Sequence, residues 1–358
     1  MKRLTVGVVF GGKSGEHEVS VASAQAVMAN MDKSRFKVVP VAITKQGRWL
    51  PAAQIKYLPS GSLKQVANSE TALEPADLDN LPHQFDVIFP LLHGPFGEDG
   101  TMQGFLDLVN VPYVGSGVLG SALGMDKIAQ KQLLQQQGLP TVKFKWWLRK
   151  TINREAGKVI QEIEADLTYP VFVKPANLGS SVGINKAHNR QELKKFLAEA
   201  CRYDRKILVE QGLEQIREIE VSVLGNDEPQ ASVCGEIKAS NEFYDYNAKY
   251  VDGKSQTIIP ADLPENLAEQ IRQAAVTVFK TLDCAGLARV DFFADVKRNK
   301  FWVNEINTIP GFTQISMYPK LWAASGISYQ DLITRLIELA LERWEDKQEN
   351  KISYEVDS

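Results

Sequence analysis

The sequence has few cysteines and histidines, little net charge and no long apolar run. Its 358 residues include three cysteines and four histidines, and no C-x-x-C pair or Cys/His cluster suggests a zinc site. A net charge of −3 provides no basic surface for nucleic acid or for an anionic membrane. No stretch approaches the length of a membrane span, and the low cysteine count suits a reducing compartment. We therefore expect a cytoplasmic protein with no nucleic-acid or membrane partner.

Two common nucleotide-binding signatures are also missing. No G-x-x-x-x-G-K-[ST] motif occurs, which excludes a Walker-type loop. Residues 115–120, GSGVLG, match G-x-G-x-x-G after a strand-like run, but no acidic residue follows about 20 residues later to hold a ribose. We reject a dinucleotide site on that ground. Any phosphate-binding site must therefore be of another kind.

Strand and helix patterns alternate in the first third of the chain. Apolar runs at 4–12, 36–44 and 85–94 indicate strands, and 18–31 indicates a helix. Such alternation predicts a parallel sheet that binds ligands at its carboxyl edge. Residues 51–84 are polar and contain prolines, which is typical of an insertion.

The rest of the chain has a mixed pattern. One helical stretch is expected at 121–138, ended by Gly138 and Pro140. Other expected elements are helices at 101–110, 190–203 and 329–350, a strand, loop and strand over 169–187, a strand at 206–213, and antiparallel strands at 219–227 and 230–238. We place domain boundaries near 115 and 212, which gives three units: 1–115, 116–211 and 212–358.

A predicted hairpin at 289–307 carries unusual polar side chains. Asp291 lies on one face of its first strand, and Glu305 and Asn307 share a face of the second. A solvated outer face is one explanation. The other is a site for a hard cation such as Mg²⁺, which prefers oxygen ligands. If residues 298–300 form the loop, Asp291 lies opposite Asn307 and diagonal to Glu305; a two-residue loop would break this register unless a bulge restored it.

Several other residues have both a structural and a functional explanation. The loop NLGSSVG (177–183) could cradle an anion with backbone N–H groups and serine hydroxyls, or be a flexible turn that leaves Lys174 on a solvated face. Lys127 is either a helix-surface lysine or a ligand contact. Glu16 either complements a helix dipole or binds a ligand ammonium. The aromatic and charged segment 242–254 suits a loop that closes over a site.

With these pieces in order, the chain resembles the D-alanine–D-alanine ligase family, of the ATP-grasp fold. The resemblance spans nearly the whole chain in the family's order. It rests on GGKSGEHEVS (11–20), HGPFGEDGTMQG (93–104), GSALGMDK (120–127), VFVKPANLGSSVG (171–183), EFYDYNAKY (242–250), RVDFFADV (289–296) and FWVNEINTIPGFTQISMYP (301–319). It implies an α/β fold in which an N-terminal parallel-sheet domain is followed by two α+β domains that grip ATP, with a lid loop at about 241–256.

The resemblance implies ATP-dependent ligation of two D-alanines through an acyl phosphate, for peptidoglycan precursor synthesis. Two Mg²⁺ ions, which Mn²⁺ could replace, would be held by Asp291, Glu305 and Asn307. ATP, a substrate, would contact Lys127, Lys174, Gly179, Ser181, Glu210, Gln211, Leu213, Glu218, Lys249, Phe293 and Asn304. The D-alanines would contact His93, Ser316 and Met317. The catalytic groups would be Glu16, Ser180, Tyr250, Arg289 and Gly311.

The same resemblance assigns roles to these groups. Glu16 would hold the first ammonium. Arg289 and the Gly311 N–H would stabilise the tetrahedral oxyanion. Ser316 and the Met317 N–H would hold the second carboxylate. Tyr250, hydrogen-bonded to Ser180 and Glu16, would close the site against water. A homodimer is expected from the resemblance alone.

The chain departs from the family pattern next to Glu210, where Gln211 and Gly212 replace a common lysine and aromatic residue. Tyr250 is typical of relatives that form a dipeptide rather than of those that join D-lactate. Relatives that use D-serine tend to have a basic residue where this chain has Met317. Three alternatives remain: a ligase with another acceptor, a kinase, and a catalytically silent sensor of ATP or amino acid, against which the presence of Arg289 and the metal ligands argues.

Overall fold

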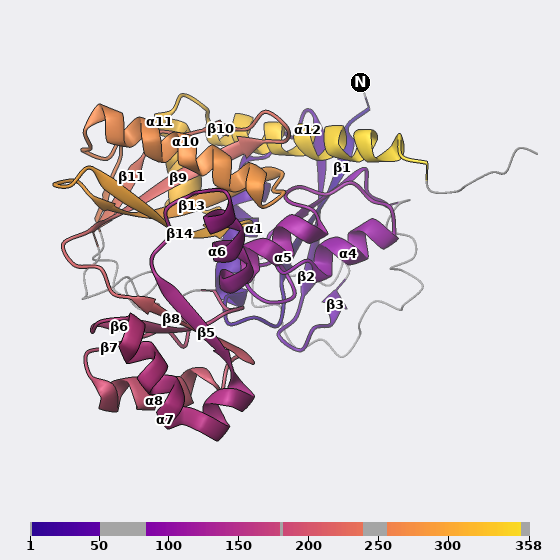
Figure 1. Ribbon diagram of the computed structural model, residues 1–358. Coiled ribbons are helices and arrows are strands. Elements are labelled where there is room, and N and C mark those ends of the chain that lie inside the picture. The colour runs from indigo at the N-terminus through magenta and orange to yellow at the C-terminus, as the bar shows by residue number, and fades with distance from the viewer. Residues whose placement is uncertain (1, 51–83, 180–181, 239–255, 352–358) are drawn as a thin grey trace, which may run out of the picture.

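The computed structural model describes residues 2–50, 84–179, 182–238 and 256–351. Within them the chain forms three sheets, each covered by helices (Figure 1). The second sheet lies apart from the first and third, below them in this view, and the third sheet faces it. The predicted insertion at 51–84 and the predicted lid at about 241–256 fall almost wholly outside the described residues.

The first sheet is parallel at its centre, as predicted. Its strand order is β3-β2-β1-β4, and β1 runs parallel to both β2 and β4. The short β3 pairs antiparallel with β2 and ends the sheet. The strands are β1 (Leu4–Gly11), β2 (Phe36–Ile43), β3 (Trp49–Leu50) and β4 (Val87–Pro90). Because parallel strands share a carboxyl edge, the loops after β1 and β4 emerge side by side.

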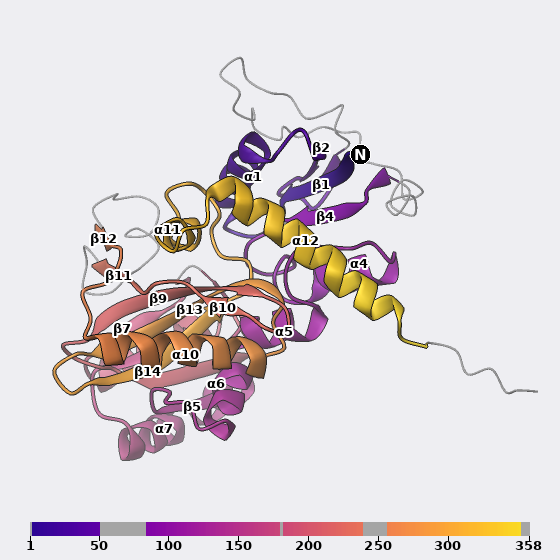
Figure 2. The same cartoon turned by 90° about the horizontal axis from the view of Figure 1, so that it is seen from above.

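Helices cover both faces of the first sheet. The buried side chains of β1 alternate: Val8 and Phe10 face α1 and α12, whereas Val9 faces α4. These helices are α1 (His17–Asn30), α4 (Thr101–Leu108) and α12 (Tyr329–Gln348). Figure 2 shows α12 crossing the molecule, so the C-terminal helix completes the core of the N-terminal sheet. Leu332 and Leu336 of α12 are fully buried.

The second sheet is antiparallel with the order β5-β8-β6-β7. Val171 and Val173 pack against the helices of this unit, and the intervening Phe172 and Lys174 face the other way. Its elements are β5 (Phe144–Leu148), α7 (Arg149–Asp166), β6 (Val171–Pro175), β7 (Asn185–Ala187), α8 (Arg190–Ala200) and β8 (Lys206–Gln211). Strand β5 and helix α7 have no counterpart among the predicted elements.

The third sheet is also antiparallel, with the order β12-β11-β9-β13-β14 and β10 beside β9. Helix α10 covers one face, and α11 packs on Ile237 near the end of β11. The elements are β9 (Arg217–Gly225), β10 (Gln230–Ala231), β11 (Gly235–Lys238), β12 (Gln256–Ile258), α10 (Glu265–Thr281), β13 (Gly286–Asp295), β14 (Lys300–Asn307) and α11 (Met317–Ala324). The opposite face of this sheet, which α10 does not cover, carries the polar side chains of the hairpin.

The single helical stretch expected at 121–138 is wrong in one respect, because the chain forms two helices there. Helix α5 (Val118–Met125) ends before Asp126, and α6 (Lys127–Gln136) begins after it. The Asp126 carboxylate accepts hydrogen bonds from the N–H groups of Ile128 (3.1 Å) and Ala129 (3.0 Å), which caps α6. The break turns the first residues of α6 toward the second sheet, where Lys206 pairs with Asp126.

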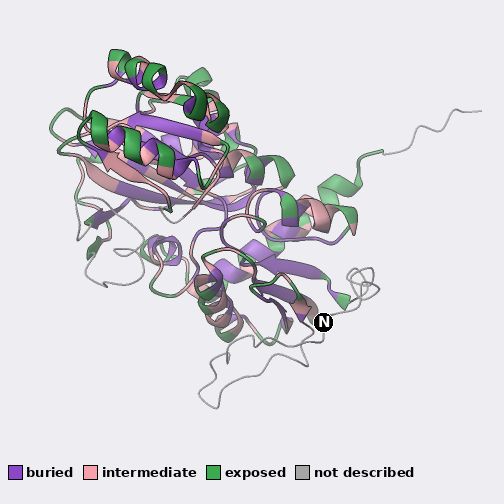
Figure 3. Ribbon diagram, turned by 90° about the horizontal axis from the view of Figure 1, so that it is seen from below, coloured by how far each residue is buried: buried purple, intermediate pink, exposed green. Residues whose placement is uncertain are grey.

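The burial pattern agrees with this layering (Figure 3). Buried residues follow the strands, and the outward faces of the helices are exposed. Among the described helices, none is long and apolar enough to cross a membrane.

Candidate active site

Two cavities meet along the uncovered face of the third sheet. The first, of about 150 Å³, lies between the second and third sheets. The second, of about 520 Å³, lies between the third sheet and the carboxyl edge of the first. Glu220 and Glu305 line both cavities, so these two carboxylates mark where they join. A ligand in one cavity can therefore reach a ligand in the other.

The hairpin has a different register from the predicted one. Its loop holds four residues, because Asp295 pairs with Lys300, and a bulge then places Asp291 directly opposite Glu305. Asn304 is the extra residue at the bulge. Asn307 lies opposite Arg289 instead of Asp291, yet its Nδ2 still donates to Asp291 Oδ2 at 3.1 Å. The predicted pairing of Asp291 with Asn307 was wrong by two residues, but the bulge brings all three oxygen-bearing side chains together.

These three side chains fit Mg²⁺ in a nucleotide site better than an all-protein metal cage. The described residues contain no group of three or more His, Cys, Asp or Glu side chains that could hold a metal. Two carboxylates and one amide instead leave ligand positions for phosphate oxygens and water, which is how Mg²⁺ is commonly held. All three side chains line one or both of the cavities, at partly buried positions.

Arg289 lines the second cavity and is largely buried. Its Nε and Nη2 each lie 2.7 Å from an oxygen of Asp291, a bidentate contact, and its Nε lies 3.1 Å from Glu220 Oε2. Burial opposes its charge, but the carboxylates of Asp291 and Glu220 raise the pKa of Arg289 well above its ordinary value. The site therefore contains a permanent cation that is held rigidly beside the oxygen ligands.

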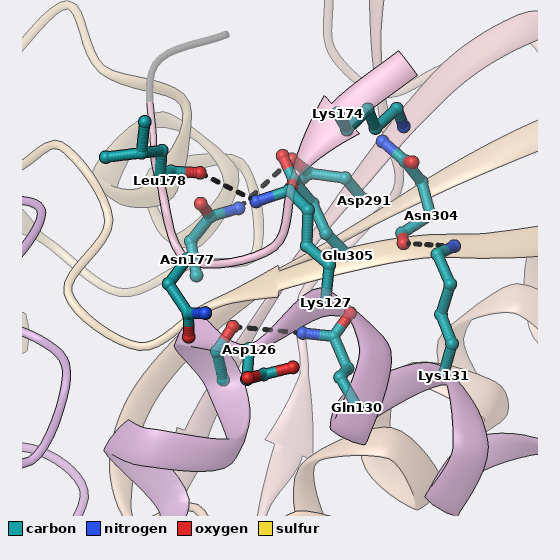
Figure 4. Close-up of polar contacts among 12 residues, drawn as sticks. Asp126, Lys127, Gln130, Lys131, Lys174, Asn177, Leu178, Asp291, Asn304 and Glu305 are labelled. Atoms are coloured by element: carbon teal, nitrogen blue, oxygen red, sulfur yellow. Dashed lines mark hydrogen bonds and ion pairs between the residues drawn. The ribbon is translucent and has the colours of Figure 1, made fainter. Parts of the chain in front are cut away.

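Two predicted lysine contacts are buried rather than solvated. The Lys127 ammonium donates to the Leu178 carbonyl at 2.8 Å and pairs with Glu305 at 3.2 Å (Figure 4). The Lys174 ammonium lies 2.5 Å from Glu210 Oε2. Both lysines thus point into the space between the second and third sheets. Their surface explanation does not hold.

Glu210 is bound by a second lysine, Lys131, which is not among the predicted contacts. Lys131 Nζ lies 2.7 Å from Glu210 Oε1, and only 1% of the Lys131 side chain is exposed. Burial alone would raise the pKa of Glu210, but the ammonium groups of Lys131 and Lys174 lower it to about 2. The carboxylate is therefore ionised at neutral pH. A lysine four residues after Lys127 on one helix face was the available signal.

The loops after β1 and β4 place the polar side chains of Glu16, His93 and Glu98 at the second cavity. A Cβ at Gly94 would lie 2.9 Å from Glu16 Oε2, and one at Gly179 would lie 3.0 Å from it, so the Glu16 carboxylate fits between two glycines. His93 Nδ1 lies 2.9 Å from the Ile309 carbonyl, and burial lowers the pKa of His93. The predicted Glu16 and His93 therefore reach the same cavity from the first sheet.

Glu98 joins the first-sheet loops to the loop that follows the hairpin. Its carboxylate accepts hydrogen bonds from the N–H groups of Gly94 (2.8 Å) and Ile309 (3.3 Å). Burial and the negative charge of Glu16 raise the pKa of Glu98 to about 8. Glu98 and Glu220 line the second cavity but were not among the predicted site residues.

The far end of the second cavity is formed by Gly311, Ser316 and Met317. Met317 begins α11, and Ser316 is its N-cap residue, so backbone N–H groups and the helix dipole are directed at this end. Ser316 Oγ accepts from the Thr313 N–H at 3.1 Å. The Met317 side chain is buried against Ile237 and Leu321. This end of the cavity can bind a small anion beside an apolar wall.

The remaining predicted contacts lie in one of the two cavities or outside the described residues. The structure places Gln211, Leu213, Glu218, Phe293 and Asn304 in the first cavity, together with Glu210, and Gly179 in the second. The Gln211 amide, however, accepts from the Thr168 N–H (2.8 Å) and donates to the Thr168 carbonyl (2.7 Å), so its side chain braces a neighbouring loop. Ser180, Ser181, Lys249 and Tyr250 lie outside the described residues.

The comparisons with known proteins agree with this arrangement. The family model described as "D-ala D-ala ligase N-terminus" matches residues 5–116, and "D-ala D-ala ligase C-terminus" matches residues 133–338. The chain is 48% identical to the D-alanine–D-alanine ligase of Natranaerobius thermophilus, covering 99% of both chains. It is 49% identical to that of Acetivibrio thermocellus, covering 95% of this chain and 96% of the relative.

Solved structures show the same likeness. The D-alanine–D-alanine ligase of Coxiella burnetii has a TM-score of 0.79 at 33% identity, covering 98% of this chain and 97% of that one. The VanG D-Ala:D-Ser ligase of Enterococcus faecalis has the same TM-score at 34% identity, covering 95% of this chain and 100% of that one. The predicted α/β, ATP-grasp fold class is thereby confirmed. The chain belongs to the D-alanine–D-alanine ligase family.

Proposed function

We propose that this protein joins two D-alanines into D-alanyl-D-alanine, with ATP converted to ADP and phosphate, for peptidoglycan precursor synthesis. The observation that carries the proposal is the junction of the two cavities. The buried Arg289 and the oxygen ligands beside it lie between two cavities. The first cavity is lined by lysines, and the second ends at the N-terminus of α11. Phosphoryl transfer to a small carboxylate needs this juxtaposition.

The first cavity is proposed to hold ATP. Lys127 and Lys174 would contact phosphate oxygens, with Gly179 and Ser181 covering them. The base and ribose would contact Glu210, the backbone at Gln211 and Leu213, and Glu218. Phe293, Asn304 and Lys249 would complete this set. The Gln211 side chain is already occupied by Thr168, which supports a contact through its backbone.

Asp291, Glu305 and Asn307 would hold two Mg²⁺ ions, or Mn²⁺ in their place. When bound, these ions would neutralise negative charge on the phosphate oxygens during transfer. The protein's own contribution is positional. The bulge at Asn304 sets the register that places Glu305 opposite Asp291, and Lys127 orients Glu305 from the side of α6.

The second cavity is proposed to hold the two D-alanines. Glu16 would accept the ammonium of the first, with His93 nearby, and Ser180 and Tyr250 would join Glu16 to close the site. Ser316 and the Met317 N–H would hold the carboxylate of the second, at the N-terminus of α11. The two amino acids would then lie on either side of Arg289.

The reaction would proceed in two bond exchanges. A carboxylate oxygen of the first D-alanine bonds to the γ-phosphorus as the bond between that phosphorus and the β–γ bridging oxygen breaks, so ADP leaves. The amine of the second D-alanine, having lost a proton, then bonds to the acyl carbon. Arg289 and the Gly311 N–H would stabilise the oxyanion of this tetrahedral intermediate. The nitrogen then loses its second proton, which the departing phosphate can accept, and breaking the carbon–oxygen bond releases phosphate and leaves the dipeptide.

A second candidate is a ligase that accepts D-serine, because the VanG D-Ala:D-Ser ligase matches this chain as well in TM-score as a D-alanine–D-alanine ligase does. The Met317 side chain favours D-alanine. It forms an apolar wall with Ile237 and Leu321 and offers no partner to a serine hydroxyl. A homodimer and a cytoplasmic location remain further proposals, from the family resemblance and the dependence on ATP respectively.

The proposal predicts that purified protein with ATP, Mg²⁺ and D-alanine forms D-Ala-D-Ala in step with phosphate. Dipeptide measured by mass spectrometry should equal phosphate measured in the same samples. Competition between equal concentrations of D-alanine, D-serine and D-lactate should give mainly D-Ala-D-Ala. Phosphate release without any dipeptide would contradict the proposal and favour a kinase or an ATPase.

A further inference from the structure

Lys131 is a buried cation that the proposed reaction leaves without a role. It lies one helical turn after Lys127 on α6. Lys174 and Glu210 line the first cavity, whereas the Lys131 side chain is only 1% exposed and contacts the far oxygen of Glu210. Lys131 is therefore behind the cavity wall and reaches the ligand space only through other groups.

The Lys131 ammonium joins two parts of the site. It lies 2.7 Å from Glu210 Oε1 on β8 and donates to the Asn304 carbonyl at 3.0 Å on β14 (Figure 4 shows the Asn304 contact). Asn304 is the bulge residue that brings Glu305 opposite Asp291. A single side chain thus links the strand that carries Glu210 to the strand that carries two oxygen ligands.

Glu210 has two lysine partners with different surroundings. Lys174 holds Oε2 from within the cavity, where a nucleotide would compete for its charge. Lys131 holds Oε1 from behind, where no ligand can reach it. Burying two cations and one anion costs free energy unless their contacts persist. A second lysine that stays on Glu210 therefore stabilises the buried carboxylate. When Lys174 turns toward phosphate, Lys131 still fixes the carboxylate.

We propose that Lys131 is a positioning residue that fixes the Glu210 carboxylate as an acceptor for the exocyclic amino group of adenine and, through Asn304, ties the base pocket to the oxygen-ligand strand. This inference rests on the proposed nucleotide site. An ionised carboxylate only accepts hydrogen bonds, so it pairs with the amino group of adenine and repels the carbonyl oxygen that hypoxanthine carries there. Base selectivity is therefore the property that Lys131 controls.

The test compares ATP with inosine triphosphate, which differs at that exocyclic group. Dissociation constants for both nucleotides with Mg²⁺ are measured by calorimetry, without D-alanine, for wild type, Lys131→Met and Lys131→Arg. Gln132→Ala, an exposed position next along the same helix, is the matched control. We expect Lys131→Met to lower the ATP preference about tenfold, the size of one hydrogen bond to a charged group. Lys131→Arg should keep most of the preference, and Gln132→Ala all of it.

A double variant separates positioning from general damage. If Lys131 acts through Glu210, Lys131→Met should have no further effect on the ATP preference in a Glu210→Gln background. Equal weakening of both nucleotides by Lys131→Met, or an unchanged preference, would overturn the inference. So would a wild type that binds both nucleotides equally. If Lys131→Met does not fold, Lys131→Gln replaces it and the same outcomes decide. Because binding is measured without D-alanine, a failure of dipeptide synthesis would contradict the proposed function and leave this test intact.

Discussion

Replacing Arg289 by alanine is expected to lower kcat about 100- to 1,000-fold, because the variant loses a fixed donor at the position where negative charge develops. The guanidinium contacts both oxygens of Asp291 and one of Glu220, so its position is set before substrates bind. KM for ATP should change much less than kcat, since Arg289 lines the second cavity and not the first. Steady-state kinetics with each substrate varied separately measures this split.

Controls must distinguish this effect from loss of folding. Alanine removes the cation from a buried group of carboxylates, which is destabilising, so the melting temperature is recorded for each variant. Arg289→Lys keeps the charge but loses the fork of donors and should recover only part of kcat. Arg298→Ala, on the same hairpin and 76% exposed, should retain wild-type kcat. A folded Arg289→Ala enzyme with near-normal kcat would remove Arg289 from the proposed chemistry.

The second large effect is expected from Glu305→Gln, which removes one of the two carboxylates in the proposed Mg²⁺ site. We expect kcat to fall about 100- to 1,000-fold at a Mg²⁺ concentration that saturates wild type. Without Mg²⁺, the substitution should not weaken ATP binding. ATP alone should bind the variant at least as well as wild type, because a negative charge beside the phosphates is gone, while Mg²⁺ should improve its binding much less.

Calorimetry of ATP binding with and without Mg²⁺ measures how much the metal improves ATP binding. The dependence of kcat on Mg²⁺ concentration is measured alongside it. Glu269→Gln is the control, since Glu269 is 63% exposed and pairs with Arg272 on the helix surface. If Mg²⁺ improved ATP binding equally in wild type and Glu305→Gln, Glu305 would not be a metal ligand. A reduced effect in the exposed control would indicate a nonspecific charge effect.

Local patterns were sufficient to predict the three parallel strands of the first sheet, but not the short β3, and the approximate position of the hairpin. Continuous apolar runs and the strand–helix alternation indicate the parallel pairing of β1 with β2 and β4. The register of the hairpin was not predictable in this way. It depends on a four-residue loop and on a bulge at Asn304, and the Asn304 carbonyl is held by Lys131 from 173 residues earlier in the chain.

Whether a charged side chain is buried also depends on segments that are distant in the sequence. Lys127 and Lys131 look like surface residues of a charged helix until the second sheet is placed against α6. Asp126 breaks the expected single helix because its carboxylate caps the next one, a local signal that the apolar pattern concealed. The predicted list of site residues came mainly from family resemblance, and for that reason it omitted Lys131, Glu98 and Glu220.

The central claim is that the first D-alanine is activated by transfer of the γ-phosphoryl group to its carboxylate. The most direct measurement uses D-alanine labelled with ¹⁸O in its carboxylate, followed by mass spectrometry of the released phosphate. An acyl phosphate transfers one labelled oxygen to each phosphate, and the peptide carbonyl retains the other. Unlabelled phosphate formed together with D-Ala-D-Ala would contradict the account, because it would show that the carboxylate oxygen never bonded to phosphorus.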